Sequence, residues 1–301
     1  MNNNVTEKLA RAFRVSDHRF RIKDIAPDDT LGLNLKDQAA ALLEAGVERL
    51  SSLQERLWAQ DRWSMLLIFQ ALDAAGKDST IKHVMSGINP AGCDVSSFKQ
   101  PSSEELDHDF LWRTTIRLPE RGRIGIFNRS YYEEVLVVRV HPEILAGQHL
   151  PETQVNDGIW KQRLGHIKAF EDYLSDQGTL IRKFYLHVSK DEQRRRFMKR
   201  LDDPEKNWKF SAADVTERQH YDEYIDAYEA AIRQTATKAA PWFVVPADHK
   251  WFIRLVVAAV VIEGLESIAP SFPKVDAKQK RQNQLARAQL EKEEESTERQ
   301  V

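Results

Sequence analysis

A glycine and a lysine stand between a run of apolar residues and a stretch with helical periodicity, an arrangement that could bind phosphate. Residues 71–80 read Ala-Leu-Asp-Ala-Ala-Gly-Lys-Asp-Ser-Thr. A phosphate-binding loop places backbone amides and a lysine around phosphate oxygens at a helix N-terminus, where the helix dipole also favours anions. Gly76 and Lys77 fit that role. Compared with the pattern G-x-x-x-x-G-K-[ST], Ala71 replaces the first glycine and Asp78 replaces the hydroxyl residue, so the prediction depends on the flanking strand and helix.

Asp73 is an unusual residue for such a loop, because its carboxylate would repel a bound phosphate. The repulsion is avoided if a cation lies between the two groups or if the carboxylate accepts a proton. A Mg²⁺ ion held by Asp73, alone or with Asp78, would bridge phosphate oxygens and neutralise charge on a transferred phosphoryl group. We therefore predict Asp73 as a ligand of Mg²⁺, with Mn²⁺ as the alternative metal. The competing interpretation is that Asp73 only stabilises a turn.

A second motif, Asn-Arg-Ser-Tyr-Tyr-Glu, begins at Asn128 after a strand-like run and should emerge beside the loop. P-loop kinases usually carry an acidic residue at this position. The amide of Asn128 cannot act as a base, so any acidic function shifts to Asp73 or Glu133. Arg129 offers a planar fork for phosphate oxygens. Glu133 could reach the same site, although Ser130 and Glu133 also match a helix capping box, and both roles remain open.

A third segment combines a basic helix with a proline-interrupted stretch rich in lysine and tryptophan. Residues 190–200 are predicted to be helical, and Arg196 and Arg200 would share a face that could line an anion channel. Residues 201–213 are typical of a mobile lid that closes over phosphates and excludes water. A solvated helix face is the other interpretation of the basic run. The expected lid contacts are Lys206, Trp208 and Lys209.

Other polar residues are weaker candidates. Single basic residues beside strand ends or helix starts could extend the anion channel. They are Lys82, Lys99, Arg113, Arg139, Arg182 and Lys183. The histidines show no metal-ligand spacing such as H-E-x-x-H, so the sequence predicts no zinc site.

Alternating apolar runs and helical patterns predict the elements that position these residues. Residues 65–69 form a short continuous apolar run, which suits a central strand buried on both faces of a parallel sheet. Further strands are expected at 93–98, 124–127, 180–188 and 242–245. Helices are expected at 36–60, 104–116, 130–137, 153–177, 190–200, 214–237 and 250–267. This alternation indicates an α/β/α sandwich whose site lies at the carboxyl ends of the strands.

Composition narrows the class of protein. The 301 residues are 42% hydrophobic, which is enough for one large domain. With 44 basic and 46 acidic residues, the formal net charge is −2, so affinity for a polyanion must come from local clustering. The single cysteine excludes an internal disulfide. Since no apolar run approaches membrane-spanning length, we expect a soluble, cytoplasmic protein without a membrane partner.

The motifs together resemble the second family of polyphosphate kinases, over roughly residues 30–272. The segments that carry the resemblance are 71–78, 86–90, 97–101, 127–133 and 201–209. The resemblance implies a thymidylate-kinase-like P-loop kinase, a three-layer α/β/α sandwich with a parallel sheet and a helical lid. Polyphosphate would run through a basic channel, and the nucleotide would enter from the lid side. It also implies that Asp73 and Lys77 are the Walker A residues and that Arg129 is the Walker B arginine.

The resemblance further implies a substrate range and a domain organisation. Asn128 combined with Glu133 is similar to the branch that accepts nucleoside mono- and diphosphates, so AMP would be converted to ADP and then ATP. The transfer is expected to be reversible, and GMP and GDP are candidate acceptors, although the sequence does not determine the preferred base. No nucleic acid is expected as a partner. Such enzymes are commonly homodimers or homotetramers. We expect an arm over residues 1–35 that covers the core or a partner subunit, a kinase domain over 36–272, and a charged tail over 273–301 that is either a solvated helix or disordered.

The sequence is also compatible with two alternative functions. An ATP-dependent nucleotide kinase with the same core would transfer phosphate from ATP but not from polyphosphate. A polyanion-binding P-loop protein without turnover is suggested by Asn128 and by the altered loop. It would bind polyphosphate without converting nucleotides.

Overall fold

The computed structural model describes residues 3–15 and 18–298, with the side chains of 4–15, 18–208 and 210–292. The chain divides into two compact units, Met1–Pro270 and Ser271–Val301. The predicted site lies in the first unit.

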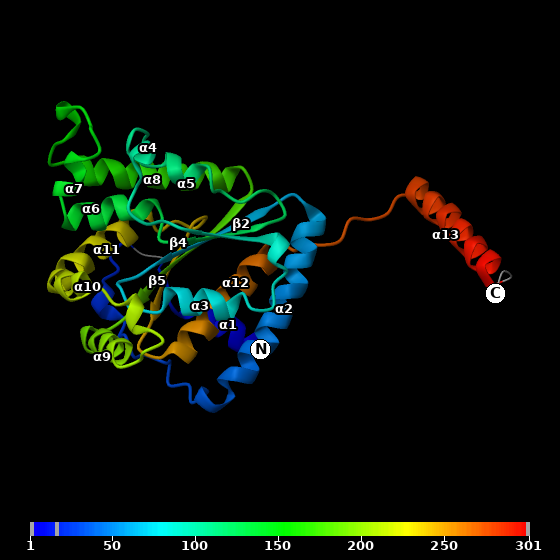
Figure 1. The fold of residues 1–301 in the computed structure, drawn as a ribbon, viewed down its shortest axis with the longest axis horizontal. Helices are drawn as coiled ribbons and strands as arrows, with labels where there is room; N and C mark the ends of the chain where they lie inside the picture. Colours follow the sequence, from blue (N-terminus) through cyan, green and yellow to red (C-terminus); the bar gives the residue numbers. More distant parts are fainter. Residues whose placement is uncertain (1–2, 16–17, 299–301) are drawn as a thin grey trace. The chain divides into compact units, whose positions relative to one another are not determined.

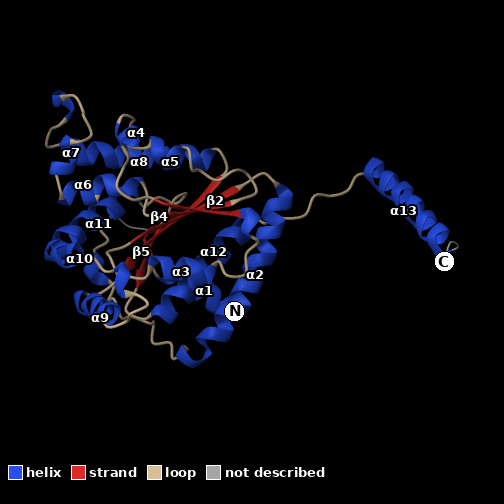
Figure 2. Ribbon diagram, viewed as in Figure 1, coloured by secondary structure: helices blue, strands red, loops and turns tan. Residues whose placement is uncertain are grey.

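A six-stranded sheet forms the centre of the first unit, in the order β1-β6-β5-β2-β4-β3 (Figure 2). The strands are β1 (Arg14–Val15), β2 (Ser64–Gln70), β3 (Cys93–Ser97), β4 (Ile124–Asn128), β5 (Thr179–His187) and β6 (Trp242–Pro246). All pairings are parallel except that of β1 with β6. The five predicted strands are confirmed. In the sheet, β2 lies between β4 and β5. The loop that follows β2 therefore lies where the connections between strands run to opposite sides of the sheet, which is the usual position of a binding site in sheets of this kind.

Helices cover both faces of the sheet (Figure 1). On one face, α12 (Lys250–Ser267) packs against α1 (Asn3–Ala12), α2 (Ala39–Gln60) and α3 (Lys77–Val84). On the other face, α8 (Ile159–Asp176) packs against α11 (Tyr221–Thr235) and β5. The predicted three-layer sandwich is therefore confirmed.

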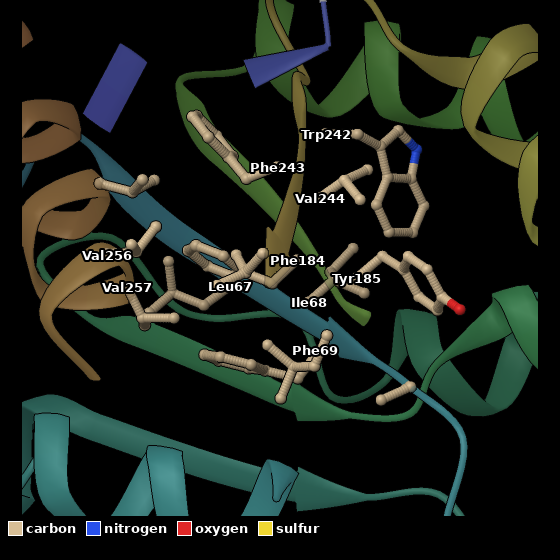
Figure 3. Packing of buried hydrophobic residues seen from close by; sticks show 14 of the residues in the cluster. Leu67, Ile68, Phe69, Phe184, Tyr185, Trp242, Phe243, Val244, Val256 and Val257 are labelled. Carbon is tan, nitrogen blue, oxygen red and sulfur yellow. The ribbon is translucent and has the colours of Figure 1, made fainter. Parts of the chain in front are cut away.

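The core lies on both faces of the central strands. Every residue of β2 is buried, which explains its continuous apolar sequence. Figure 3 shows Val256 and Val257 of α12 on the side of Phe184 and Phe243, whereas Trp242 lies on the opposite side. Because α12 is enclosed between the sheet and other helices, its residues 255–262 are all apolar, so this part of the helix is apolar on every side.

The N-terminal segment contains structure that periodicity did not reveal. Leu9 and Phe13 are buried against the core, and β1 adds an antiparallel edge strand to β6. A helix of ten residues and a strand of two are short for a pattern-based prediction.

Several predicted helix boundaries were wrong. The helix expected at 104–116 is two short ones, α4 (Ser103–Leu106) and α5 (Trp112–Thr115). Between them the Asp109 carboxylate accepts a hydrogen bond from the Leu111 N–H at 2.9 Å, a local turn that competes with helix. The helix expected at 130–137 is a 3₁₀ helix (Tyr131–Val135) followed by α6 (Val137–Val140).

Two longer helices also differ from expectation. The helix expected at 153–177 begins only at Ile159, after a short 3₁₀ turn (Glu152–Gln154). The region 214–237 is divided into α10 (Ala212–Glu217), a 3₁₀ turn (Arg218–His220) and α11. The remaining helices and turns are Ile22–Asp24, Lys36–Gln38, Pro90–Gly92, α7 (Glu143–Ala146), α9 (Lys190–Leu201) and Asn207–Lys209.

The second unit contains one helix, α13 (Ala277–Glu298). Arg287 and Glu291 form an i,i+4 ion pair at 2.8 Å on its exposed surface. Of the two forms expected for the charged tail, the helix is observed. Within the described part of the chain, no helix is long and apolar enough to cross a membrane.

A buried polar network joins the sheet to the helices behind the predicted site. Lys183 on β5 and Glu171 on α8 form an ion pair with both side chains fully buried. Glu171 also accepts hydrogen bonds from the hydroxyls of Tyr131 at 3.0 Å and Tyr132 at 2.8 Å. Because Tyr131 and Tyr132 lie between Arg129 and Glu133 in the sequence, the network fixes the segment that carries both residues.

Replacing Lys183 by methionine is expected to lower the free energy of unfolding by about 3–5 kcal/mol, because Glu171 would become an unpaired buried carboxylate. Urea denaturation measures this loss. Lys168→Met is the matched control, since Lys168 forms an exposed pair with Asp172 on α8 and should cost less than about 1 kcal/mol. Equal effects of the two substitutions would contradict the importance of the buried pair.

Candidate active site

The loop after β2 has the backbone of a phosphate cradle. Ala74 and Gly76 both have positive φ angles, +62° and +109°. For Ala74 this conformation is strained, and strain of this kind persists only where the surroundings enforce it. Gly76 is the N-cap residue of α3, and Lys77 is its first residue. The structure therefore places the predicted loop at a helix N-terminus, as expected from the sequence.

Lys77 is folded back along this loop. Its ammonium donates a hydrogen bond to the carbonyl oxygen of Ala71 at 2.6 Å. Burial lowers the pKa of Lys77, while the nearby carboxylate of Asp73 acts in the opposite direction. A partly desolvated ammonium inside the loop is positioned to interact strongly with a phosphate oxygen.

Arg129 connects two carboxylates across the loop. Its Nη2 lies 3.1 Å from Asp73 Oδ1, and its Nη1 lies 3.3 Å from Glu133 Oε2. The carboxylate of Glu133 is the largest cause of the raised pKa of Arg129. Arg129 has a φ of +65°, a second strained position at the same edge of the sheet. The structure thus brings Asp73, Arg129 and Glu133 together, as the sequence predicted.

Glu133 faces the site rather than completing a capping box. Ser130 does cap the 3₁₀ helix, because its hydroxyl accepts a hydrogen bond from the Tyr132 N–H. The Glu133 side chain points to Arg129 instead. With the Gln70 amide oriented to donate, its nitrogen lies 2.8 Å from Glu133 Oε1. Burial raises the pKa of Glu133, and Arg129 partly offsets that effect.

The raised pKa predicts how Glu133 affects stability. A carboxyl whose pKa is higher in the folded state contributes stability below its unfolded pKa, near 4.5, and loses it as the pH rises through the folded pKa. Glu133→Gln removes this titration. We therefore expect the variant to gain stability relative to wild type as the pH rises above about 4.5, measured by thermal unfolding.

The surface substitution Glu152→Gln, measured alongside, separates this effect from the general pH dependence of the protein. Lower stability of Glu133→Gln than of wild type at neutral pH would contradict the inferred cost of the buried carboxylate.

Asn128 and Asp78 meet at the mouth of the loop. The Asn128 amide donates to Asp78 Oδ1 at 2.6 Å. Asp78 therefore has a partner from the neighbouring strand, and Asn128 links β4 to the first turn of α3.

A cavity of about 330 Å³ opens beside the loop. Asp73, Arg129 and Glu133 line one side. The other side is formed by three tyrosines of α11, by His141 after α6, and by residues of the α10 region. These further lining residues are Asp214, Glu217, Arg218, Tyr221, Tyr224 and Tyr228. The cavity therefore joins a charged end to an aromatic wall, which is the composition expected of a small-molecule site.

Sequence reasoning missed this aromatic wall. Tyr221, Tyr224 and Tyr228 recur at helical spacing, a signal that equally indicates ordinary core packing. Glu217 accepts hydrogen bonds from His141 Nε2 at 2.8 Å and from the Tyr224 hydroxyl. This contact connects α10 to the end of α6 beside the cavity, and no sequence spacing indicates it.

The other predicted binding residues have different environments. Arg113 is buried, lies 3.6 Å from Glu134 and donates to the carbonyl of Lys99 at 2.8 Å. The Lys99 side chain is exposed, and Arg139 is partly exposed. Neither Arg113 nor Lys99 is among the residues that line the 330 Å³ cavity.

The predicted lid extends from α9 to α10. Arg200 lies 3.5 Å from Asp214, which ties the end of α9 to α10. Lys206 pairs with Asp203 in solvent, and Trp208 is 74% exposed. The Lys209 side chain lies outside the part of the chain that the structure describes.

The site fits a divalent metal that is held partly by a substrate. Among the described residues, no three His, Cys, Asp or Glu side chains are arranged to hold a metal by themselves. Asp73 and Glu133 nevertheless present carboxylates to the cavity. This is the donor set of Mg²⁺ sites in phosphoryl-transfer enzymes, where one or two carboxylates act together with substrate phosphates.

Comparison with known proteins gives a consistent family assignment. Residues 34–273 match the family model described as polyphosphate kinase 2. An ADP-polyphosphate phosphotransferase from Rhodopseudomonas palustris is 54% identical over 256 residues, which cover 85% of this chain and 89% of that protein. An AMP/ADP-polyphosphate phosphotransferase from Meiothermus ruber is 45% identical, over 87% of this chain and 95% of that protein.

A solved structure agrees with these relatives. The crystal structure of polyphosphate kinase 2 from Arthrobacter aurescens superimposes with a TM-score of 0.84 and 38% sequence identity. The match covers 92% of this chain and 96% of that chain.

Proposed function

Because this chain belongs to the polyphosphate kinase 2 family, we propose that its site transfers phosphoryl groups from inorganic polyphosphate to the terminal phosphate of a nucleotide. The observation that supports this most strongly is the convergence of Asp73, Arg129 and Glu133 at the charged end of one cavity, with Lys77 in the adjoining loop. Two cations and two carboxylates in this position suit a reaction in which phosphate charge must be bound, oriented and neutralised.

Each group has a distinct role in this proposal. The loop amides and Lys77 hold the donor phosphate. The planar fork of Arg129 binds oxygens around the transferred phosphorus, where charge accumulates in the transition state. The carboxylates of Asp73 and Glu133 hold Arg129 in its orientation, so little rearrangement is needed during transfer. The acceptor phosphate needs little deprotonation, which agrees with Asn128 in place of an acid.

The family's phosphotransferases typically need a divalent metal. We propose Mg²⁺ as that ion and Asp73 as its ligand, with Glu133 within reach of the same phosphates. When bound, the ion would neutralise phosphate charge and orient the phosphate oxygens.

The aromatic wall and the lid complete the site. Tyr221, Tyr224 and Tyr228 offer apolar ring surface to a nucleoside while Arg129 holds its phosphate. The segment 201–213 would exclude water, which would otherwise hydrolyse the donor.

We propose that both AMP and ADP are acceptors, with ATP as the final product. The two relatives differ here, since one is named for ADP and the other for AMP and ADP. In a time course that starts from AMP and is analysed by chromatography, ADP should appear first and ATP later. GMP is tested as an acceptor in the same way. Turnover of ADP but not of AMP would restrict the site to diphosphates.

A further inference from the structure

Two side chains on one face of α9 bind three successive carbonyls of the phosphate loop. The Gln193 amide donates to the carbonyl of Asp73 at 3.0 Å. Arg196 Nη1 donates to the carbonyls of Ala74 at 3.1 Å and Ala75 at 2.6 Å. Gln193 and Arg196 are three residues apart and therefore share a helix face. α9 thus holds the outer side of the loop along its strained part.

These contacts determine where the loop amides point. In a trans peptide, the carbonyl of one residue and the N–H of the next point in opposite directions. Since the carbonyls of Asp73 and Ala75 face α9, the N–H groups of Ala74 and Gly76 point away from it. Within the described residues neither N–H has a hydrogen-bond partner, whereas the Ala75 N–H closes a turn to Leu72 at 3.3 Å. Two N–H donors are therefore left for an anion.

All N–H donors of the Arg196 guanidinium form hydrogen bonds within the protein. Besides the two loop carbonyls, it donates from Nη2 to the carbonyls of Ala247 at 2.6 Å and Asp248 at 3.2 Å. Its Nε donates to Glu192 at 2.8 Å. A guanidinium has five N–H donors, so each one is engaged. The side chain is 8% exposed, and it connects the phosphate loop to the segment after β6.

The Gln193 side chain is held by a residue that follows the lid segment 201–213. Arg218, which follows α10, donates from Nε to Gln193 Oε1 at 3.0 Å and from Nη2 to the carbonyl of Lys190 at 2.9 Å. Because the amide oxygen of Gln193 is used by Arg218, its nitrogen must face Asp73. Arg218 also lines the cavity. The phosphate loop, α9 and the base of the lid thus form one connected set of hydrogen bonds.

We propose that Gln193 and Arg196 are positioning residues that keep the phosphate loop in its ligand-binding conformation, and that Arg218 sets the orientation of Gln193. The proposal rests on the function proposed above, because it assumes that the loop binds the polyphosphate donor. It replaces the expectation that Arg196 lines an anion channel with an indirect role through backbone carbonyls.

The test uses Arg196→Lys and Gln193→Met, with Arg194→Gln as the matched control. Lysine supplies a single ammonium and cannot bond both pairs of carbonyls. Methionine keeps the approximate length of glutamine but makes no hydrogen bonds. Arg194 lies on the exposed face of the same helix. We expect kcat/KM for polyphosphate to fall about 10²-fold in Arg196→Lys and about tenfold in Gln193→Met, and to stay at the wild-type value in the control.

A second measurement separates positioning from general stability. Calorimetric titration with tripolyphosphate, without nucleotide, should show weaker binding in both variants, while the KM for ADP changes less than about twofold in Arg196→Lys, whose substituted residue does not line the cavity. Wild-type kinetics in the folded variants, or a loss confined to the KM for ADP, would overturn the inference. Should Arg196→Lys fail to fold, Gln193→Met decides the question alone. Absence of turnover in the wild-type protein would instead overturn the proposed function.

Discussion

Replacing Lys77 by methionine is expected to lower the rate of phosphoryl transfer by at least about 10³-fold, because the loop loses the charge that we propose to contact the donor phosphate. The fold should persist. Burial already lowers the pKa of Lys77, so the charged side chain does not add to stability at this position. The measurement is the initial rate of ATP formation from ADP and polyphosphate, together with the thermal unfolding midpoint.

Lys161→Met provides the control for this substitution, since Lys161 is an exposed residue of α8. It should retain wild-type activity. A well-folded Lys77→Met variant with turnover within about tenfold of wild type would contradict the assignment of the phosphate loop.

The second large effect is expected for Arg129→Lys, with a loss of about 10²–10³-fold in kcat. Lysine keeps the positive charge but presents a single ammonium, which cannot bond Asp73 and Glu133 and bind a phosphate with the same planar geometry. Because the change affects orientation more than charge, kcat should fall more than substrate affinity. Steady-state kinetics with polyphosphate and ADP varied separately distinguish the two.

Arg123→Lys is the matched control, since Arg123 precedes β4 whereas Arg129 follows it. Arg123 pairs on the surface with Asp94 at 3.3 Å and Glu120 at 3.1 Å. The control should leave both kinetic constants unchanged. An equal, small effect of the two substitutions would contradict a role of the Arg129 fork in the transition state.

The sequence predicted the sheet and the charged end of the site because both depend on local patterns. Continuous apolar runs correspond to strands buried on both faces, and β2 is buried along its whole length. In a parallel sheet, residues that follow neighbouring strands meet at one edge. Phe69 pairs with Asn128, so the loop and Arg129 had to meet once the two strands were identified.

The parts that could not be predicted depend on tertiary contacts. Gln193 and Arg196 contact loop carbonyls about 120 residues away, and no spacing in α9 distinguishes their face from a solvated one. The tyrosines of α11 are equally compatible with core packing. The N-terminal helix is stabilised by its contact with α12 rather than by a long periodic pattern. Such contacts become visible only when the chain is folded.

The most direct test of the central claim is incubation of the purified protein with ADP, Mg²⁺ and long-chain polyphosphate, in the absence of ATP, with nucleotides followed by chromatography. The account predicts that ATP appears in wild type, that its formation depends on polyphosphate and on the metal, and that Lys77→Met forms almost none. Tight binding of polyphosphate without conversion of ADP or AMP, or transfer to AMP from ATP alone, would contradict it.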